Sequence, residues 1–171
     1  YLDNNASSIP LPSVVEAVTR AMQAGFGNPS SVHSAGNRAR AALRDAREVV
    51  AEFVGASHAD VVFTSGATEA NNLALQSLLQ GPGSRLVTTA VEHSSVLATA
   101  DYLRARGTEV VILGVDASGR VDAESVAAAV VPGRTLVSVQ WANNETGVVQ
   151  DLPNIARAAH DAGALFHTDA V

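Results

Sequence analysis

The sequence predicts an α/β fold with a mostly parallel sheet flanked by helices. From residue 60 onward, short runs rich in β-branched residues alternate with longer stretches in which apolar residues recur at helical spacing. This alternation indicates βαβ units, whose successive strands run parallel. The composition agrees, because 47% of the 171 residues are hydrophobic and 16% are charged, as in a globular chain able to form a core.

The first part of the chain is predicted to consist of loops and two helices. Residues 1–12 are polar and interrupted by prolines, which indicates an extended loop. Ser13 then precedes a helical pattern that stops at Gly25, and a turn-rich loop follows it. The stretch from Asn37 to Phe53 has the apolar spacing of a second helix, which Gly55 closes.

Five strands and four helices are expected in the remainder. The expected strands are residues 61–64, 85–89, 109–113, 135–139 and 165–168. The expected helices are residues 68–79, 95–106, 123–130 and 152–162. No internal repeat, low-complexity tract or linker interrupts the pattern, so these elements are expected to share one sheet.

Four polar motifs follow or end these predicted strands. They are SGATEANN (65–72), VEHSSV (91–96), NNETG (143–147) and FHTDA (166–170). In open α/β sheets, ligands bind outside the carboxyl ends of the strands. We therefore expect the four motifs to converge on one ligand although the sequence separates them.

The segment from Ser65 to Glu69 marks the expected turn from a strand into a helix. Gly66 permits a ligand to approach the backbone, and the unpaired N–H groups and dipole of a helix start favour an anion. With the Thr68 hydroxyl, these groups suit a phosphate, although the segment is neither a P-loop nor GxGxxG. In the alternative interpretation, Ser65 or Thr68 caps the helix and Glu69 stabilises its first turn.

Imidazole and amide side chains follow two further strands. His93 is placed to stack on a planar cofactor or to transfer protons, and the alternative is a loop histidine that is only hydrogen-bonded. Asn143, Asn144 and Glu145 suit a ligand hydroxyl or carboxylate. Consecutive asparagines also form plain turns, so both interpretations stay open.

Asp169 ends a strand that is otherwise apolar. A carboxylate in that position is costly unless it meets a cation or hydrogen-bond donors. A protonated pyridine nitrogen is such a cation, and the pairing keeps the ring an electron sink. A helix cap or a surface ion pair is the alternative. Taken together, the four motifs match what pyridoxal 5'-phosphate (PLP) requires: a phosphate site, a stacking imidazole, an amide and a buried carboxylate.

Charge and composition disfavour several other functions. The net charge of −6 and the pI of about 5.2 disfavour nucleic acid and anionic membrane surfaces as partners. No apolar run is long enough to span a bilayer, no secretory signal is evident, and cytoplasm is the expected location. The remaining histidines lack metal-ligand spacing, so no metal site is predicted, and His167 inside the last strand is interpreted as structural.

At this point the chain resembles a known family, the cysteine desulfurases of the class V aminotransferase group of fold-type I PLP-dependent enzymes. The resemblance covers essentially all 171 residues and rests on YLDNNASS, GNPSSVHSAG, VVFTSGATEANNLAL, Glu92-His93, NNETGVVQD and FHTDAV in order and spacing. It implies that residues 1–171 form the N-terminal part of the PLP-binding large domain. Residues 1–36 would provide leading loops and the first helix, and residues 60–171 the alternating strands and helices.

The resemblance also implies roles for individual residues in cofactor binding. Ala67 and Thr68 would bind the PLP phosphate. His93 would stack on the pyridine ring and, as the catalytic residue, assist proton transfer. Asn144 would lie beside the phenolic oxygen of the cofactor, and Asp169 would pair with the pyridine nitrogen.

The reaction implied is the conversion of L-cysteine to L-alanine. Asn5 and Ala6 would line the substrate side, and Asn144 would also meet the substrate carboxylate. Sulfur would leave as a persulfide on an enzyme cysteine and pass to an acceptor or scaffold protein for iron–sulfur cluster assembly. Enzymes of this family are homodimers with the active site at the interface.

The chain lacks two side chains that this reaction needs. It contains no lysine to bind PLP covalently and no cysteine to carry the persulfide. Because the chain begins at Tyr1 and stops at Val171 just after a predicted strand, we expect a fragment of a longer protein, inactive by itself. The alternatives are another class V PLP enzyme, such as an aminotransferase or selenocysteine lyase, and a non-catalytic truncated binding domain.

Overall fold

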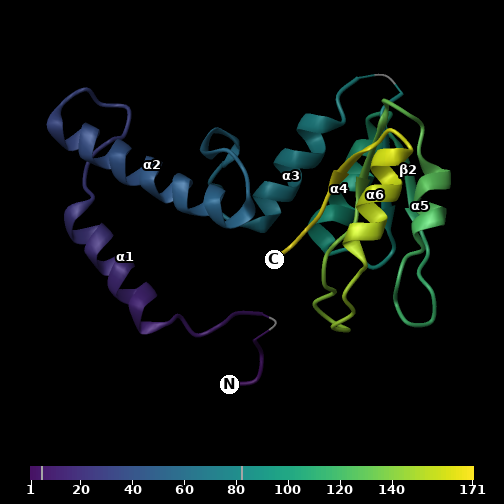
Figure 1. Ribbon diagram of the computed structural model, residues 1–171, viewed down its shortest axis with the longest axis horizontal. Helices are drawn as coiled ribbons and strands as arrows, with labels where there is room; N and C mark the ends of the chain where they lie inside the picture. The colour runs from purple at the N-terminus through teal and green to yellow at the C-terminus, as the bar shows by residue number, and fades with distance from the viewer. Residues whose placement is uncertain (5, 82) are drawn as a thin grey trace. The chain divides into compact units, whose positions relative to one another are not determined.

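The computed structural model describes residues 1–4, 6–81 and 83–171 (Figure 1). The chain is divided into two compact units, Tyr1–Phe63 and Thr64–Val171. The polar motifs expected to converge all lie in the second unit, so that unit carries the candidate site. The first unit is considered by itself.

Two helices form most of the first unit, as the sequence predicts. They are α1 (Pro12–Ala24) and α2 (Ser34–Val54), followed by the short 3-10 helix η1 (His58–Asp60). Helix α2 starts three residues before the expected position, because the His33 side chain accepts a hydrogen bond from the N–H of Gly36. Gly36 lies inside the helix, where a Cβ atom would come within 2.3 Å of the Ser31 carbonyl oxygen.

The second unit contains four helices and a four-stranded parallel sheet. Its strands lie side by side in the order β2-β1-β3-β4. The strands are β1 (Arg85–Thr89), β2 (Glu109–Leu113), β3 (Thr135–Ser138) and β4 (Leu165–His167). The helices are α3 (Ala67–Leu78), α4 (Ser94–Ala105), α5 (Ala123–Ala129) and α6 (Leu152–Asp161). The predicted α/β class is confirmed, and the ends of these eight elements fall within one residue of the predicted positions.

The expected strand at residues 61–64 is wrong. Val61 has an extended backbone, but residues 61–64 form no ladder with any strand among the described residues. A β-branched run becomes a strand only when a neighbour accepts and donates its backbone hydrogen bonds. Val62 and Phe63 are exposed, so this run also lacks the burial that strengthens a strand.

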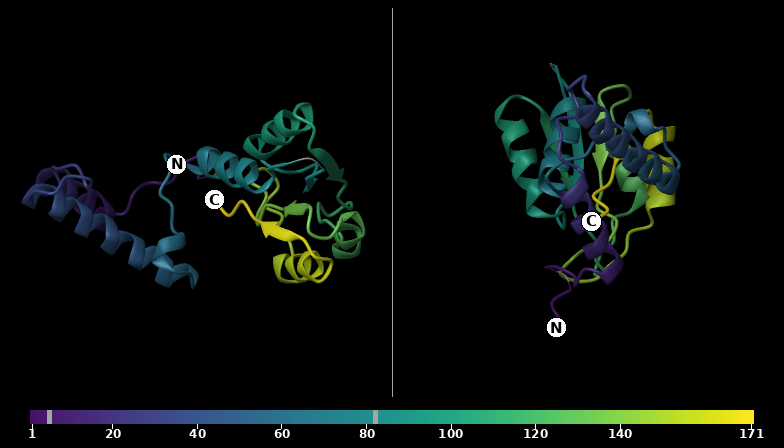
Figure 2. Two further views of the ribbon diagram at one scale, coloured as in Figure 1. Left: turned by 90° about the horizontal axis from the view of Figure 1, so that it is seen from above. Right: turned by 90° about the vertical axis from the view of Figure 1, so that its left-hand side faces the viewer.

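The sheet lies between two pairs of helices (Figure 2), and its central strands β1 and β3 are buried on both faces. Because side chains alternate along a strand, Leu86 and Leu136 point to one face while Val87 and Val137 point to the other. The leucine face packs against α3 and α4, and the valine face packs against α5 and α6. Burial on both faces at these positions explains why β1 and β3 carry apolar residues at two successive positions rather than alternating ones.

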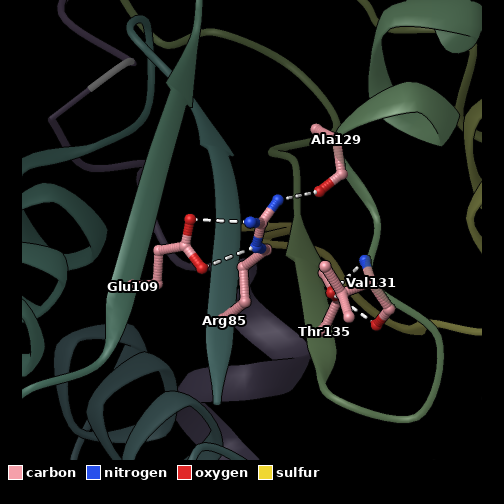
Figure 3. Close-up of polar contacts among 5 residues, drawn as sticks. All are labelled: Arg85, Glu109, Ala129, Val131 and Thr135. Atoms are coloured by element: carbon pink, nitrogen blue, oxygen red, sulfur yellow. Dashed lines mark hydrogen bonds and ion pairs between the residues drawn. The ribbon is translucent and has the colours of Figure 1, made fainter. Parts of the chain in front are cut away.

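Polar contacts close the amino-terminal edge of the sheet (Figure 3). Arg85 and Glu109 are directly opposed on β1 and β2, with Nη2 to Oε1 at 2.6 Å and Nε to Oε2 at 3.1 Å. Arg85 Nη1 also donates to the Ala129 carbonyl oxygen at 2.7 Å, at the end of α5. Thr135 Oγ1 accepts from the Val131 N–H at 2.8 Å.

The chain changes direction across the sheet between β1 and β3. From β1 it passes to β2 on one side, and β3 and β4 follow on the other side. A crevice opens outside the carboxyl ends of strands at such a switch point, which is where open α/β sheets bind ligands. The segments that follow β1 and β3 border this switch point, and they contain the VEHSSV and NNETG motifs.

Candidate functional site

The amino-terminal end of α3 presents unpaired backbone donors. Gly66 occupies the N-cap position without any side-chain cap, so neither Ser65 nor Thr68 caps this helix. Glu69 instead reaches back and accepts from the Ser65 N–H at 2.7 Å and from its hydroxyl at 2.6 Å, which lowers the pKa of Glu69. The N–H groups of Ala67 and Thr68 have no partner within the described part of the chain. A Cβ on Gly66 would meet nothing within 4 Å, so this helix start is open to an anion.

His93 caps helix α4 from the segment that follows β1. Its Nδ1 accepts from the Ser95 backbone N–H at 3.2 Å and lies 2.8 Å from the Ser95 hydroxyl. The His93 side chain is exposed, whereas Ser95 is buried. The ring is therefore anchored through Nδ1 and leaves its other edge and its faces accessible.

Glu92, next to His93, is a buried carboxyl group to which sequence reasoning assigned no role. Its Oε1 accepts from the Thr89 hydroxyl at 2.6 Å, and both oxygens lie within 3.1 Å of the Gln140 N–H, which donates to them. Burial raises the pKa of Glu92 to about 7, and the charge of Asp169 adds to the rise, while the two donors oppose it. Glu92 thus ties the end of β1 to the segment after β3.

Asn143 and Asn144 play different parts in the loop after β3. The Asn143 Oδ1 accepts from the N–H groups of Glu145 and Thr146 at 2.9 and 2.8 Å, so this side chain forms the turn. Its Nδ2 donates to the Val91 carbonyl oxygen at 2.9 Å and joins the turn to the His93 segment. Asn144 is exposed, and its only hydrogen-bond partner among the described residues is the adjacent Glu145, so its amide is accessible to a ligand.

Asp169 follows β4 and lies beside the segment after β3, where the Trp141 N–H donates to its carbonyl oxygen at 2.8 Å. Its Oδ2 accepts from the Asn71 amide at 2.8 Å and its Oδ1 from the Val171 N–H at 3.3 Å. The residue is half-buried and forms no salt bridge with any described residue. It caps no helix among the described residues and joins no ion pair there.

Asn71 is a second residue that sequence reasoning passed over. It is buried in the second turn of α3, and its Nδ2 donates both to Asp169 and to the Ser95 hydroxyl, the latter at 3.0 Å. Asn71 lies about one helical turn, roughly 5.4 Å, beyond the open start of α3. The only signal in the sequence was its place inside SGATEANN, because its two partners are distant along the chain.

His167 lies inside β4, with Nδ1 at 2.9 Å from the Ser138 hydroxyl. Burial lowers its pKa, and the nearby Asp169 charge partly offsets that effect.

No group of three or more His, Cys, Asp or Glu side chains that could hold a metal occurs among the described residues. In that part of the chain, no helix is long and apolar enough to cross a membrane.

A groove of about 580 Å³ runs between α3 and α4 beside these residues. It reaches Thr68 and Ser95, but His93, Asn144 and Asp169 do not line it. It is thus a neighbouring groove and not the space in front of the strand ends.

Of the two expected substrate residues, Ala6 lies in the first unit and is exposed, and Asn5 lies outside the described residues.

The chain is similar to proteins of known activity along its whole length. Residues 1–171 match the family described as aminotransferase class-V. The chain is 47% identical to a cysteine desulfurase of Bradyrhizobium diazoefficiens, over 100% of this chain and 44% of that protein. It is 44% identical to the cysteine desulfurase NifS of Azotobacter vinelandii, over 100% of this chain and 43% of NifS.

Solved structures give the same result. A NifS-like protein superposes with a TM-score of 0.93 at 35% identity, over 100% of this chain and 48% of that one. SspA in complex with cysteine superposes with a TM-score of 0.91 at 36% identity, over 99% of this chain and 50% of that one. The chain therefore spans about half the length of the relatives that it matches.

Proposed function

Because the chain belongs to the aminotransferase class-V family and is homologous to the PLP-dependent cysteine desulfurases, we propose that it forms the N-terminal part of the PLP-binding domain of such an enzyme. The complete protein would convert L-cysteine to L-alanine and pass the sulfur to an acceptor or scaffold protein for iron–sulfur cluster assembly. One observation carries the proposal: His93, Asn144 and Asp169 follow the three adjacent parallel strands β1, β3 and β4, of which the first two flank the switch point of the sheet.

The described residues fit PLP at both of its charged ends. The open N–H groups of Ala67 and Thr68, together with the Thr68 hydroxyl, suit the phosphate, which favours a helix start. The half-buried Asp169 has hydrogen-bond donors but no cation among the described residues, and it suits a protonated pyridine nitrogen. When bound, PLP supplies an electron sink for chemistry at the substrate α-carbon.

The side chains of these residues would then bind the cofactor, orient the substrate and transfer a proton. His93, anchored through Nδ1, would stack on the ring, and its other nitrogen would be free to hold or move a proton. Asn144, whose amide is accessible, would contact the phenolic oxygen and the substrate carboxylate. The relative that was solved in complex with cysteine supports an amino acid of this kind as substrate.

The 171 residues do not contain every group that the reaction requires. They include no lysine for covalent attachment of PLP and no cysteine for sulfur transfer. We therefore propose that these residues are inactive alone, and that the complete protein is a cytoplasmic homodimer supplying both groups. In this arrangement the 171 residues would contact the phosphate, the ring face and the pyridine nitrogen of PLP.

The test is an assay of the complete protein with L-cysteine, PLP and a thiol reductant such as dithiothreitol, which reduces the persulfide and releases its outer sulfur as sulfide, with alanine and sulfide both measured. We expect the two products in equal amounts, and none from the 171-residue chain. Asp169→Ala should lower the rate by at least about 100-fold, the lower range for loss of a catalytic electrostatic partner. Selenocysteine as the only productive substrate, or transamination without sulfide release, would replace the desulfurase proposal with one of its class V alternatives.

A further inference from the structure

A buried chain of hydrogen bonds joins His93 to Asp169. It runs from His93 Nδ1 to the Ser95 hydroxyl at 2.8 Å, from there to Asn71 Nδ2 at 3.0 Å, and from the same Nδ2 to Asp169 Oδ2 at 2.8 Å. Asn71 and Ser95 are 4% and 7% exposed, so water does not readily replace these bonds. The two residues at the ends of this series of hydrogen bonds are Asp169, assigned to the pyridine nitrogen, and His93, assigned to the ring face.

The direction of each hydrogen bond can be worked out. An ionised carboxylate only accepts, so Asn71 must turn its NH₂ group toward Asp169. The second hydrogen of that NH₂ group then points to the Ser95 oxygen, which accepts it. The Ser95 hydroxyl hydrogen is left to donate to His93 Nδ1, where the Ser95 backbone N–H also donates.

These directions fix the tautomer of the neutral imidazole. A nitrogen that accepts from a backbone N–H and a hydroxyl carries a lone pair, so the ring proton must be on Nε2. His33 offers a comparison within this chain, because its Nδ1 also caps a helix but accepts only from the Gly36 N–H, at 3.4 Å. Among the described residues, no buried serine or asparagine contacts the His33 ring.

We propose that Asn71 is a positioning residue that holds the Asp169 carboxylate and, through the Ser95 hydroxyl, keeps the His93 ring proton on Nε2. The inference rests on the proposed function for its purpose: one buried amide sets both the partner of the pyridine nitrogen and the donor on the stacking ring. The effects of Asn71 on Asp169 and on His93 can be separated, because Asn71 bonds to Asp169 directly and reaches His93 only through Ser95. Loss of Ser95 alone should therefore affect His93 and spare Asp169.

The first experiment measures the tautomer in the complete protein without PLP. Two-bond ¹H–¹⁵N correlation spectra of ¹⁵N-histidine-labelled protein distinguish a protonated from an unprotonated Nδ1. We expect His93 to show only the Nε2–H form in the wild type. A detectable Nδ1–H form should appear in Ser95→Ala, where only the longer 3.2 Å bond from the backbone N–H remains, and in Asn71→Ala, where the Ser95 hydroxyl is free to turn and accept. Asn72→Ala is the matched control, because Asn72 is the next residue of α3 and bonds to Thr68, Gln76 and Thr99 instead.

The second experiment measures PLP affinity by absorbance titration of the same proteins. Loss of a hydrogen bond to a charged group predicts roughly tenfold weaker binding in Asn71→Ala. Ser95→Ala and Asn72→Ala should stay within about twofold of wild type, a difference expected of sites that lose no charged bond. Circular dichroism melting of each variant identifies one that fails to fold, and Ser95→Ala then still decides the link to His93.

Three results would overturn the inference. One is a wild-type His93 with a protonated Nδ1, and another is an unchanged tautomer in Ser95→Ala. The third is equal loss of PLP affinity in Asn71→Ala and Asn72→Ala, which would mean general disturbance of α3. If the wild-type protein bound no PLP, the proposed function would fall together with the cofactor part of this inference, while the spectra of the unliganded protein would still decide the hydrogen-bond chain.

Discussion

Replacing Glu92 with glutamine should remove a pH-dependent loss of stability. Glu92 is 6% exposed, and burial raises its pKa from the ordinary value of 4.5 to about 7. Between these two values the unfolded chain has lost the Glu92 proton while the folded chain retains it. Since the folded state then binds more protons, the free energy of unfolding falls as the pH rises from about 4.5 to about 7, and it levels off above that range.

The size of this effect follows from the raised pKa. The difference between 4.5 and about 7, at about 1.36 kcal/mol for each pKa unit, corresponds to about 3 kcal/mol. The wild-type protein should therefore lose about 3 kcal/mol relative to Glu92→Gln between roughly pH 4 and pH 8. Comparing the two proteins at each pH cancels the contribution of the other titrating groups.

Urea unfolding followed by tryptophan fluorescence measures this difference. Trp141 is the only tryptophan of the chain and follows Gln140, whose N–H donates to Glu92. Thr89→Val serves as a second variant, because removing a donor that favours the ionised carboxylate should enlarge the fall. A flat difference between wild type and Glu92→Gln, or a wild type that gains stability as the pH rises, would refute the reasoning. The first result would mean that the hydrogen bonds from Thr89 and Gln140 offset burial, and the second that they outweigh it.

Three further predictions concern the frame of the site. Val137→Ala, in the fully buried centre of β3, should lower the free energy of unfolding by about 2–4 kcal/mol in urea, as the loss of buried methyl groups does. Asn143→Ala should cost about 1–3 kcal/mol, because the Val91 carbonyl and the turn lose their half-buried hydrogen-bond partner, and a change below about 0.5 kcal/mol would contradict this role. The lowered pKa of His167 means that the unfolded chain binds a proton first as the pH falls, so stability should decrease below about pH 6.5, and His167→Gln should flatten that decrease in the same unfolding assay.

The elements of the second unit were predictable because each is specified locally. Leu86-Val87 and Leu136-Val137 are apolar pairs on successive positions, and strands buried on both faces need apolar side chains at both. The run at residues 61–64 has the same local character but finds no neighbouring strand among the described residues. Strand pairing is a long-range property, which explains why the same pattern gave the right answer at β1 and β3 and the wrong one here.

The candidate site was predictable only in part, for a similar reason. His93, Asn144 and Asp169 could be placed because a residue that follows a parallel strand lies at a known edge of the sheet. Asn71 and Glu92 could not be assigned roles in that way, since the partners that define them lie 98 residues away at Asp169 and 48 residues away at Gln140. No sequence pattern near Asn71 or Glu92 indicates those partners.

The order of the strands, more than any single motif, determines where His93 lies. Because β1 and β3 are neighbours, the segments after them can bond to each other, and the Val91 carbonyl oxygen accepts from Gln140 Nε2 at 2.5 Å and Asn143 Nδ2 at 2.9 Å. Glu92 adds its bonds to the Gln140 N–H, so the residues just before His93 are held by the segment after β3. A substitution in the NNETG turn should thus disturb His93 although the two are about fifty residues apart in sequence, whereas an equally exposed change in α6 should not.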